Sequence, residues 1–281
     1  MFSSLLAQAA EQPQGTLAWV DKIARTTIGI MVGILAILTF LRFLIFPYLL
    51  KTDPAKRTAL YSFAKFFNEL VDALTYAGLA VFLIIRPYIV QTYYVPTGSM
   101  IPTIKEGDFL LTNKYSYRLG NPQVKNIAVF WSPKVGILNP NELTYIKRVI
   151  GTPGDTVVVK DGLLYRNGTR VEEPYLNDPI MMYDFKLVYT GGRYVPVIMM
   201  GGDNVNNTRL TAPAFRTHDP AMMQYLKKLP PVKIPKDHYI MMGDNRNGSY
   251  DSRSWGLVPR DAYIAKSEFI WLPFKDMGFT R

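Results

Sequence analysis

A long apolar run near the N-terminus constrains this chain more than any other feature of its sequence. Residues 26–41 carry no charged side chain, and the run continues over residues 43–50 if Arg42 reaches towards an interface. A membrane-spanning helix needs about 20 predominantly apolar residues, and a helix that is apolar on every side is buried in a core or in lipid. We therefore predict a transmembrane helix over residues 26–50, preceded by an N-terminal tail, residues 1–25.

A second apolar run follows. Residues 73–85 are uncharged, which alone would also suit a core or interfacial helix, but extension of the helix at both ends gives a second span over residues 66–90. The intervening segment, residues 51–65, carries the cations Lys51, Lys56, Arg57 and Lys65. By the positive-inside rule we expect this loop in the cytoplasm. The tail and residues 91–281 then lie on the outer side.

Composition excludes several kinds of site. The chain has no cysteine, which excludes a disulfide framework, a thiol nucleophile and a cysteine-based metal site. Its net charge of +10 fits either solubility and membrane topology or attraction to anionic lipid headgroups. The sequence contains no dense basic run with interleaved aromatic residues, so nucleic acid is not an expected partner.

Short strand-like runs separated by turn residues recur through the predicted outer domain. Two of the turns are Asp161-Gly162 and Asn167-Gly168, dipeptides typical of two-residue β-hairpins. This spacing predicts a mainly-β domain built on a barrel-like or sandwich-like sheet. Prolines and methionine pairs interrupt the pattern over residues 171–236, which we interpret as an inserted subdomain. The strand-like runs are residues 108–111, 127–131, 145–150, 156–160, 163–166 and 238–242.

A serine follows the second apolar run in a stretch that restricts the backbone. Pro96 and Pro102 bracket it, and each proline fixes its own φ and favours an extended conformation in the preceding residue. Gly98 permits a sharp turn immediately before Ser99. Such a stretch would hold a serine hydroxyl in a defined position, as a nucleophile requires, but Thr-Gly-Ser is also ordinary turn chemistry.

A serine nucleophile needs a base, and the sequence offers two kinds. His218 and His238 are the histidines that could complete a Ser-His-Asp triad, and the alternative is a lysine that is neutral at working pH. In a β-strand, Tyr145, Lys147 and Val149 share one face. Burial of that face would lower the pKa of Lys147, whereas exposure would leave an ordinary surface lysine.

Four segments stand in a fixed order after the apolar runs. They are residues 96–103 (Pro-Thr-Gly-Ser-Met-Ile-Pro-Thr), 107–108 (Gly-Asp), 145–155 (Tyr-Ile-Lys-Arg-Val-Ile-Gly-Thr-Pro-Gly-Asp) and 243–256 (beginning Gly-Asp-Asn). Together they resemble the sequence boxes of bacterial type I signal peptidases, a family of serine proteases with a Ser-Lys dyad. The resemblance covers most of residues 92–275 and is weaker over 171–236. It implies transmembrane helices, a mainly-β catalytic domain of the signal-peptidase fold, and an inserted subdomain.

The resemblance implies a role for each matched residue. Ser99 would be the nucleophile and Lys147 the general base. Thr97 stands where the family often has a hydroxyl residue that completes the oxyanion hole with the Ser99 backbone N–H. Ser249 would hydrogen-bond the lysine amine. The supporting residues would be Asp244 and an ion pair formed by Asp251 and Arg253.

The implied activity is that of a membrane-bound endopeptidase that removes signal peptides from exported preproteins by cutting after small residues. The substrate backbone would add to the sheet as a strand, with small side chains in shallow apolar pockets. The substrate-binding residues would be Tyr93, Val95, Pro96, Met100, Tyr145 and Ile146.

The resemblance also implies partners and a location. Preprotein signal peptides and membrane lipid are the expected partners, with the secretion machinery nearby, and no cofactor or metal is expected. The chain would be a multi-pass protein of the bacterial cytoplasmic membrane with its catalytic domain on the extracytoplasmic side.

Two other classes of protein share part of this pattern. Related Ser-Lys proteases include the self-cleaving repressors of DNA-damage responses, but these are soluble, and the apolar segments argue against them. A membrane-anchored interaction protein without enzymatic activity is the other class. The presence of Ser99, Lys147 and Ser249 argues against that reading.

Overall fold

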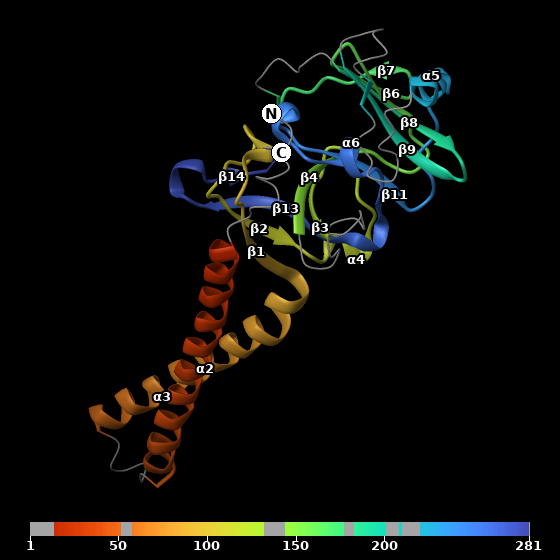
Figure 1. Ribbon diagram of the computed structural model, residues 1–281. Coiled ribbons are helices and arrows are strands. Elements are labelled where there is room, and N and C mark those ends of the chain that lie inside the picture. Colours follow the sequence, from red (N-terminus) through yellow and green to blue (C-terminus); the bar gives the residue numbers. More distant parts are fainter. Residues whose placement is uncertain are drawn as a thin grey trace. The chain divides into compact units, whose positions relative to one another are not determined.

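The chain divides into two compact units, Met1–Pro87 and Tyr88–Arg281 (Figure 1). The computed structural model describes residues 14–51, 58–131, 144–176, 183–200, 208–209 and 220–280.

Two long helices form the N-terminal unit. The first, α2 (Gln14–Lys51), is followed by α3 (Ala59–Ala80), which continues as the π-helix η2 (Val81–Ile89). Arg42 on α2 forms an ion pair with Asp72 on α3 at 2.8 Å between Nη1 and Oδ1. The two helices therefore pair with each other inside this unit.

Most of the described side chains of these helices are exposed or only partly buried. The stretches Val32–Lys51 and Ala59–Arg86 are each long and apolar enough to cross a membrane, and almost none of their side chains is buried. The predicted span 26–50 lies within α2, and the predicted span 66–90 lies on α3 and η2 except for Val90, which begins β1. The predicted loop cations Lys56 and Arg57 lie outside the described residues.

One antiparallel sheet forms the centre of the second unit. Its strands are ordered β1-β2-β13-β3-β4-β11-β12, with β14 added to β13. Strands distant in sequence are neighbours here, because β13 lies between β2 and β3. The strands are β1 (Val90–Tyr94), β2 (Phe109–Asn113), β3 (Ile127–Trp131), β4 (Thr144–Gly151), β11 (His238–Met242), β12 (Val258–Pro259), β13 (Tyr263–Leu272) and β14 (Gly278–Phe279).

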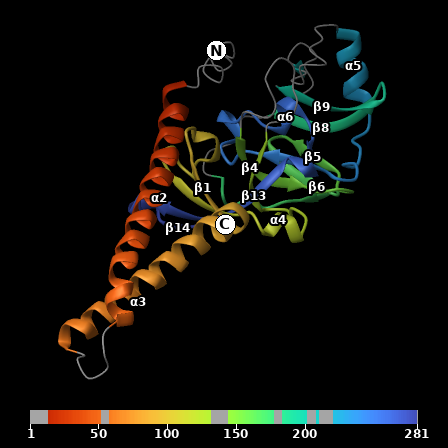
Figure 2. The same cartoon turned by 90° about the horizontal axis from the view of Figure 1, so that it is seen from below.

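A second antiparallel sheet has the order β10-β9-β8-β5-β6-β7. Figure 2 shows β9, β8, β5 and β6 of this sheet. Both predicted hairpin turns are confirmed: Asp161-Gly162 and Asn167-Gly168 have positive φ at all four residues and join β5 to β6 and β6 to β7. The strands are β5 (Val157–Lys160), β6 (Leu163–Arg166), β7 (Thr169–Arg170), β8 (Tyr183–Thr190), β9 (Arg193–Met200) and β10 (Thr208–Arg209).

Strands on both sides of residue 171 share this second sheet, because Val158 and Val159 of β5 pair with Lys186 and Phe185 of β8. The helix α5 (Pro220–Lys228) contributes Leu226 to an apolar cluster with β8 and β9. The remaining short helices are η3 (Gly98–Met100), α4 (Ser116–Leu119), η6 (Arg246–Gly248), α6 (Ser252–Trp255), η7 (Arg260–Ala262) and η8 (Phe274–Asp276).

Strand β4 separates two apolar clusters. Tyr145 and Val149 pack with the aromatic cluster that includes Phe130 and Trp255. Ile146 packs with the other cluster, whose members are Val95, Met100, Ile104, Leu110, Ile127 and Ile270. The alternation expected for this strand is therefore present, and β4 is packed on both faces.

Candidate active site

Packed neighbours on both sides hold Ser99 in place. Ser99 lies in η3, shortly after β1, and Val95 and Met100 around it are 2% and 0% exposed. The Val95 N–H donates to the Asp108 carbonyl at 2.9 Å, and the Gly107 N–H donates to the Val95 carbonyl at 2.9 Å. Packing and backbone bonds thus fix a serine that is itself buried.

Lys147 on β4 reaches Ser99 directly. Its Nζ donates to the Ser99 Oγ at 2.7 Å and to the Ile146 carbonyl at 2.8 Å. Lys147 is 2% exposed, and its Nζ lies 5.7 Å from the centre of the Tyr145 ring. In this geometry the lysine is the donor, so it must lose a proton before it can accept one from the serine.

The pKa of Lys147 is lowered from the ordinary 10.5 to about 8. Burial is the largest cause, because it takes the ammonium out of water. Asp251 and Asp244 raise the pKa, and Arg253 lowers it further. About one tenth of this side chain is therefore neutral at pH 7, and about half is neutral at pH 8.

Thr97 is exposed, and its hydroxyl lies close to the Ser99 side chain. Its Oγ1 donates to the Ser99 Oγ at 3.5 Å, a long hydrogen bond that is readily exchanged. Thr97 has an extended backbone immediately before η3. This conformation puts its hydroxyl and the Ser99 side chain within reach of one another.

The loop after β11 holds the backbone of η3. The Asn245 N–H donates to the Ser99 carbonyl at 3.1 Å, and the Asn245 Nδ2 donates to the Gly98 carbonyl at 3.1 Å. Gly243 has no room for a side chain, since a Cβ there would lie 2.4 Å from the Ser99 carbonyl oxygen and 2.3 Å from the Ser249 Oγ. The two segments are therefore in close contact.

Ser249 lies in that close contact, but its hydroxyl makes no hydrogen bond within the described part of the chain. It lies near enough to Asp251 to help stabilise the carboxylate, although their geometry falls short of a hydrogen bond. The expected hydrogen bond between the Ser249 hydroxyl and the Lys147 amine is therefore not formed in this structure.

Asp251 and Arg253 form a buried bidentate pair. Arg253 donates through Nε at 2.7 Å and Nη2 at 2.6 Å, and the Gly243 N–H donates to the same carboxylate at 3.0 Å. Burial would raise the pKa of Asp251, but the charge and hydrogen bonds of Arg253 outweigh it and lower the pKa. The carboxylate thus ties the two ends of the loop together.

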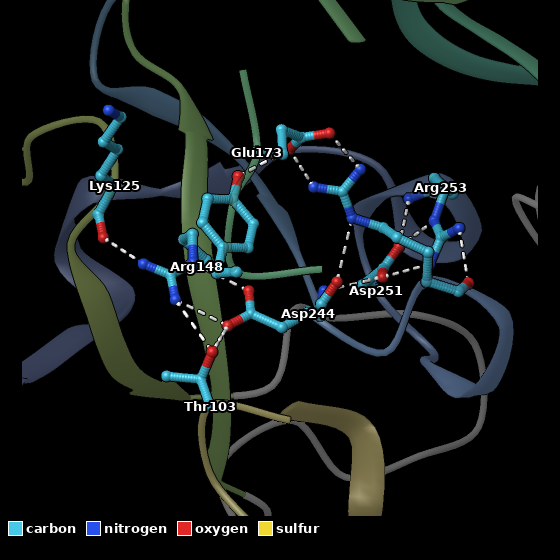
Figure 3. A network of polar contacts seen from close by, with 10 residues as sticks. Thr103, Lys125, Arg148, Glu173, Asp244, Asp251 and Arg253 are labelled. Atoms are coloured by element: carbon cyan, nitrogen blue, oxygen red, sulfur yellow. Dashed lines mark hydrogen bonds and ion pairs between the residues drawn. The ribbon is translucent and has the colours of Figure 1, made fainter. Parts of the chain in front are cut away.

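Asp244 pairs with Arg148 rather than with the lysine. The Arg148 Nε and Nη2 donate to the two carboxylate oxygens at 2.8 and 2.6 Å, and the Thr103 hydroxyl donates at 2.5 Å (Figure 3). No role was predicted for Arg148 from the sequence alone. Strand alternation, which puts Arg148 on the face opposite Lys147, was the available signal for this contact.

The predicted substrate-binding residues differ in accessibility. Val95 and Met100 are core residues, and Pro96 is exposed. Tyr145 packs against Trp255 with ring centroids 4.9 Å apart. Of the others, Ile146 is half-buried beside the Val95 cluster, and Tyr93 is half-buried on β1 with its pKa raised to about 12 by burial.

Two strand edges near Ser99 lack a partner strand among the described residues. β1 is the end strand of its sheet. In β4, residues 144–147 pair with β3 on one side, while β11 begins to pair on the other side only at Arg148. An extended peptide can add to such edges through main-chain hydrogen bonds.

The histidines contribute less to this site than the lysine. His238 begins β11, whereas the loop that contacts Ser99 follows the last residue of that strand, about 13 Å further along. Its Nδ1 lies 2.8 Å from the Lys236 carbonyl. His218 lies outside the described residues.

Two apolar helices followed by a β-domain with a buried serine–lysine contact are the features of a membrane-anchored serine endopeptidase. Residues 67–272 match the family model described as signal peptidase, peptidase S26. The chain therefore belongs to the signal peptidase I family, whose members remove signal peptides.

Curated relatives carry the same name. The chain is similar to a probable signal peptidase I-1 of Synechocystis sp., with 31% identity over 76% of this chain and 87% of that protein. It is 32% identical to signal peptidase IB of Staphylococcus aureus over 76% of this chain and 95% of that protein. Identity to signal peptidase I of Pseudomonas aeruginosa is 32% over 70% of each chain.

Proposed function

We propose that this signal peptidase cleaves preproteins with Ser99 as the nucleophile and neutral Lys147 as the general base. The observation that carries the proposal is the contact of 2.7 Å between the Lys147 Nζ and the Ser99 Oγ, in a setting that lowers the pKa of the lysine to about 8. A buried neutral amine at this distance can take the hydroxyl proton as the serine attacks.

In the first half-reaction, the Ser99 Oγ bonds to the scissile carbonyl carbon, and its proton passes to the Lys147 Nζ. The resulting oxyanion would accept hydrogen bonds from the Ser99 backbone N–H and the Thr97 hydroxyl, which exchanges its long bond to Ser99 for the stronger charge-assisted one. Collapse breaks the C–N bond as Lys147 returns the proton to the leaving amine. A water molecule, deprotonated by the same amine, then hydrolyses the acyl-enzyme.

Substrate specificity in this proposal follows from the strand edges and the packed core beside Ser99. A signal peptide would add as a strand between β1 and residues 144–147 of β4. Its side chains near the cut would face Val95, Met100 and Ile146, which already fill one cluster. We expect the space that remains to be shallow, so that small side chains fit and large ones do not.

The membrane arrangement is part of the same proposal. Residues 26–50 and 66–90 would both span the bacterial cytoplasmic membrane, with residues 51–65 inside and the peptidase domain, residues 91–281, outside. The supporting observations are the two apolar helices and the cations in the sequence between them. A reporter fused after Arg281 should be active only outside the cytoplasm; cytoplasmic activity would overturn this topology.

Cleavage of a model preprotein tests the catalytic assignment. The wild-type enzyme should release the mature protein, and Ser99→Ala should release none while keeping the wild-type Tm. Cleavage by Ser99→Ala at a rate near that of the wild type would assign the nucleophile to another residue.

A further inference from the structure

A buried ion pair between Glu173 and Arg246 joins the segment that follows β7 to the loop beside Ser99. Glu173 belongs to the stretch that follows β7, and its side chain is 7% exposed. Its partner, Arg246, is 2% exposed at the side chain and lies in η6. The Arg246 Nη1 donates to the Glu173 Oε2 at 3.0 Å, and the Nη2 donates to the Oε1.

Arg246 connects several parts of the loop. Its Nε donates to the Gly243 carbonyl at 3.1 Å, and its own carbonyl accepts from the Arg253 Nη1 at 2.9 Å. Asn245, which precedes Arg246, donates its N–H to the Ser99 carbonyl. A shift of Arg246 would therefore move the backbone that holds the serine in place.

Tyr175 reinforces the same contact. Its hydroxyl donates to the Glu173 Oε1 at 2.6 Å, and the Arg148 guanidinium lies 4.0 Å from the centre of its ring. Burial raises the pKa of the Tyr175 phenol, so the hydroxyl keeps its proton and remains a donor. Figure 3 shows Glu173 and the Arg148–Asp244 pair in one continuous network.

Each of three buried guanidinium groups in this network has a carboxylate facing it. Asp244 faces Arg148, Asp251 faces Arg253, and Glu173 faces Arg246; Glu173 is the member of the set that comes from outside the motifs singled out in the sequence. Loss of one carboxylate from such a pair leaves a buried charge that the rest of the loop must accommodate by moving.

We infer that Glu173 is a positioning residue for the peptidase reaction, acting through Arg246 on the loop that holds the Ser99 backbone. The inference rests on the proposed function of Ser99. The residues that follow β7 would then contribute to the reaction, because they hold the loop after β11 in the geometry that attack by Ser99 requires. Misplacement by about 1 Å can cost about 100-fold in rate.

The test is steady-state kinetics of the full-length enzyme on a model preprotein, well below the Tm of each variant. Glu173→Gln keeps the shape of the side chain and removes its charge, and kcat should fall by about 10- to 100-fold with KM changed less than about twofold. The matched control is Glu172→Gln, at an exposed neighbour that pairs with Arg170 at 3.5 Å on the surface, and it should match the wild type. A lower Tm with unchanged kcat would make Glu173 merely structural and overturn the inference.

One further variant keeps the inference testable if Glu173→Gln does not fold, and a double variant tests it if Glu173→Gln does fold. Tyr175→Phe keeps the stacked ring and removes only the hydroxyl bond to Glu173, and kcat should fall by about threefold; an unchanged kcat would contradict the inference. In Arg246→Gln combined with Glu173→Gln, the loss should be much smaller than the product of the two single losses.

The failure of this inference is distinguishable from the failure of the proposed function. If Ser99→Ala is inactive while Glu173→Gln keeps full kcat, only the positioning role is wrong. If Ser99→Ala remains active, the proposed function is wrong and the positioning role falls with it.

Discussion

The pH dependence of kcat/KM should report the ionisation of Lys147 in the free enzyme. With a pKa of about 8 in place of the ordinary 10.5, about one tenth of the lysine is neutral at pH 7 and about nine tenths at pH 9. Activity should therefore rise about tenfold across this interval and level off near pH 9.

The sign of this effect follows from the role of the lysine. Only the deprotonated amine accepts the Ser99 proton, so activity is lost as the pH falls through the lowered pKa. The lowered pKa corresponds to a free-energy cost of about 3 kcal/mol for the Lys147 ammonium in the folded protein, and burial is the largest cause of this cost.

Initial rates on a synthetic signal-peptide substrate between pH 6 and pH 10, at substrate concentrations far below KM, give this profile. Lys160→Arg is a suitable control, because Lys160 is exposed at the end of β5 and its variant should give the wild-type curve. A rate that keeps rising tenfold per pH unit beyond pH 9 would indicate an ordinary lysine and refute the reasoning. A plateau already reached near pH 7 would direct the search for the base to His218 and His238.

Three further changes have defined outcomes. Thr97→Val removes a hydroxyl and keeps the shape, so kcat should fall by about 10²–10³-fold with little change in KM, whereas Thr97→Ser should be nearly neutral. If the two variants have the same kcat, backbone amides alone stabilise the oxyanion. Gly243→Ala would place a Cβ 2.4 Å from the Ser99 carbonyl oxygen and should abolish cleavage, and an active variant would show that this contact can relax. The pKa of Lys147 is about 8 in the folded protein and 10.5 in the unfolded one, so its charge destabilises the fold below pH 8, and this penalty fades between pH 8 and 10.5. Lys147→Met should therefore raise the free energy of unfolding by about 1–3 kcal/mol at pH 7 and by progressively less as the pH rises. Urea denaturation measures this difference.

Local sequence patterns predicted β2, β3, β4 and β11 of the central sheet, and β5 and β6 of the second sheet. Residues 127–131 and 238–242 are strands with the predicted bounds, and both two-residue hairpins form where positive φ was required. The hairpin of β8 and β9 was not predicted, because Pro196 interrupts its second strand. Pro196 is tolerated there because β10 pairs with β9 only at Ile198 and Met199. No hydrogen bond to β10 is therefore lost where the proline has no N–H.

The candidate site was predicted in its sequence motifs but not in its connections. Strand alternation put Lys147 on one face of β4 and left its burial open, and the structure answers that question because both faces are packed. The pairing of Glu173 with Arg246 joins residues far apart in the chain, and no local period or spacing encodes such a contact. Glu173 follows β7 of the second sheet and Arg246 follows β11 of the central sheet, so only the tertiary structure brings them together.

The most direct test of the central claim compares preprotein cleavage by Ser99→Ala, by Lys147→Ala and by the variant that carries both changes. If the two side chains act as one catalytic unit, each single variant should fall to the same residual rate and the double variant should fall no further. Lys147→Arg, which keeps a cation that cannot give up its proton, should join them while remaining folded. A folded Lys147→Arg enzyme with most of the wild-type activity would contradict the account.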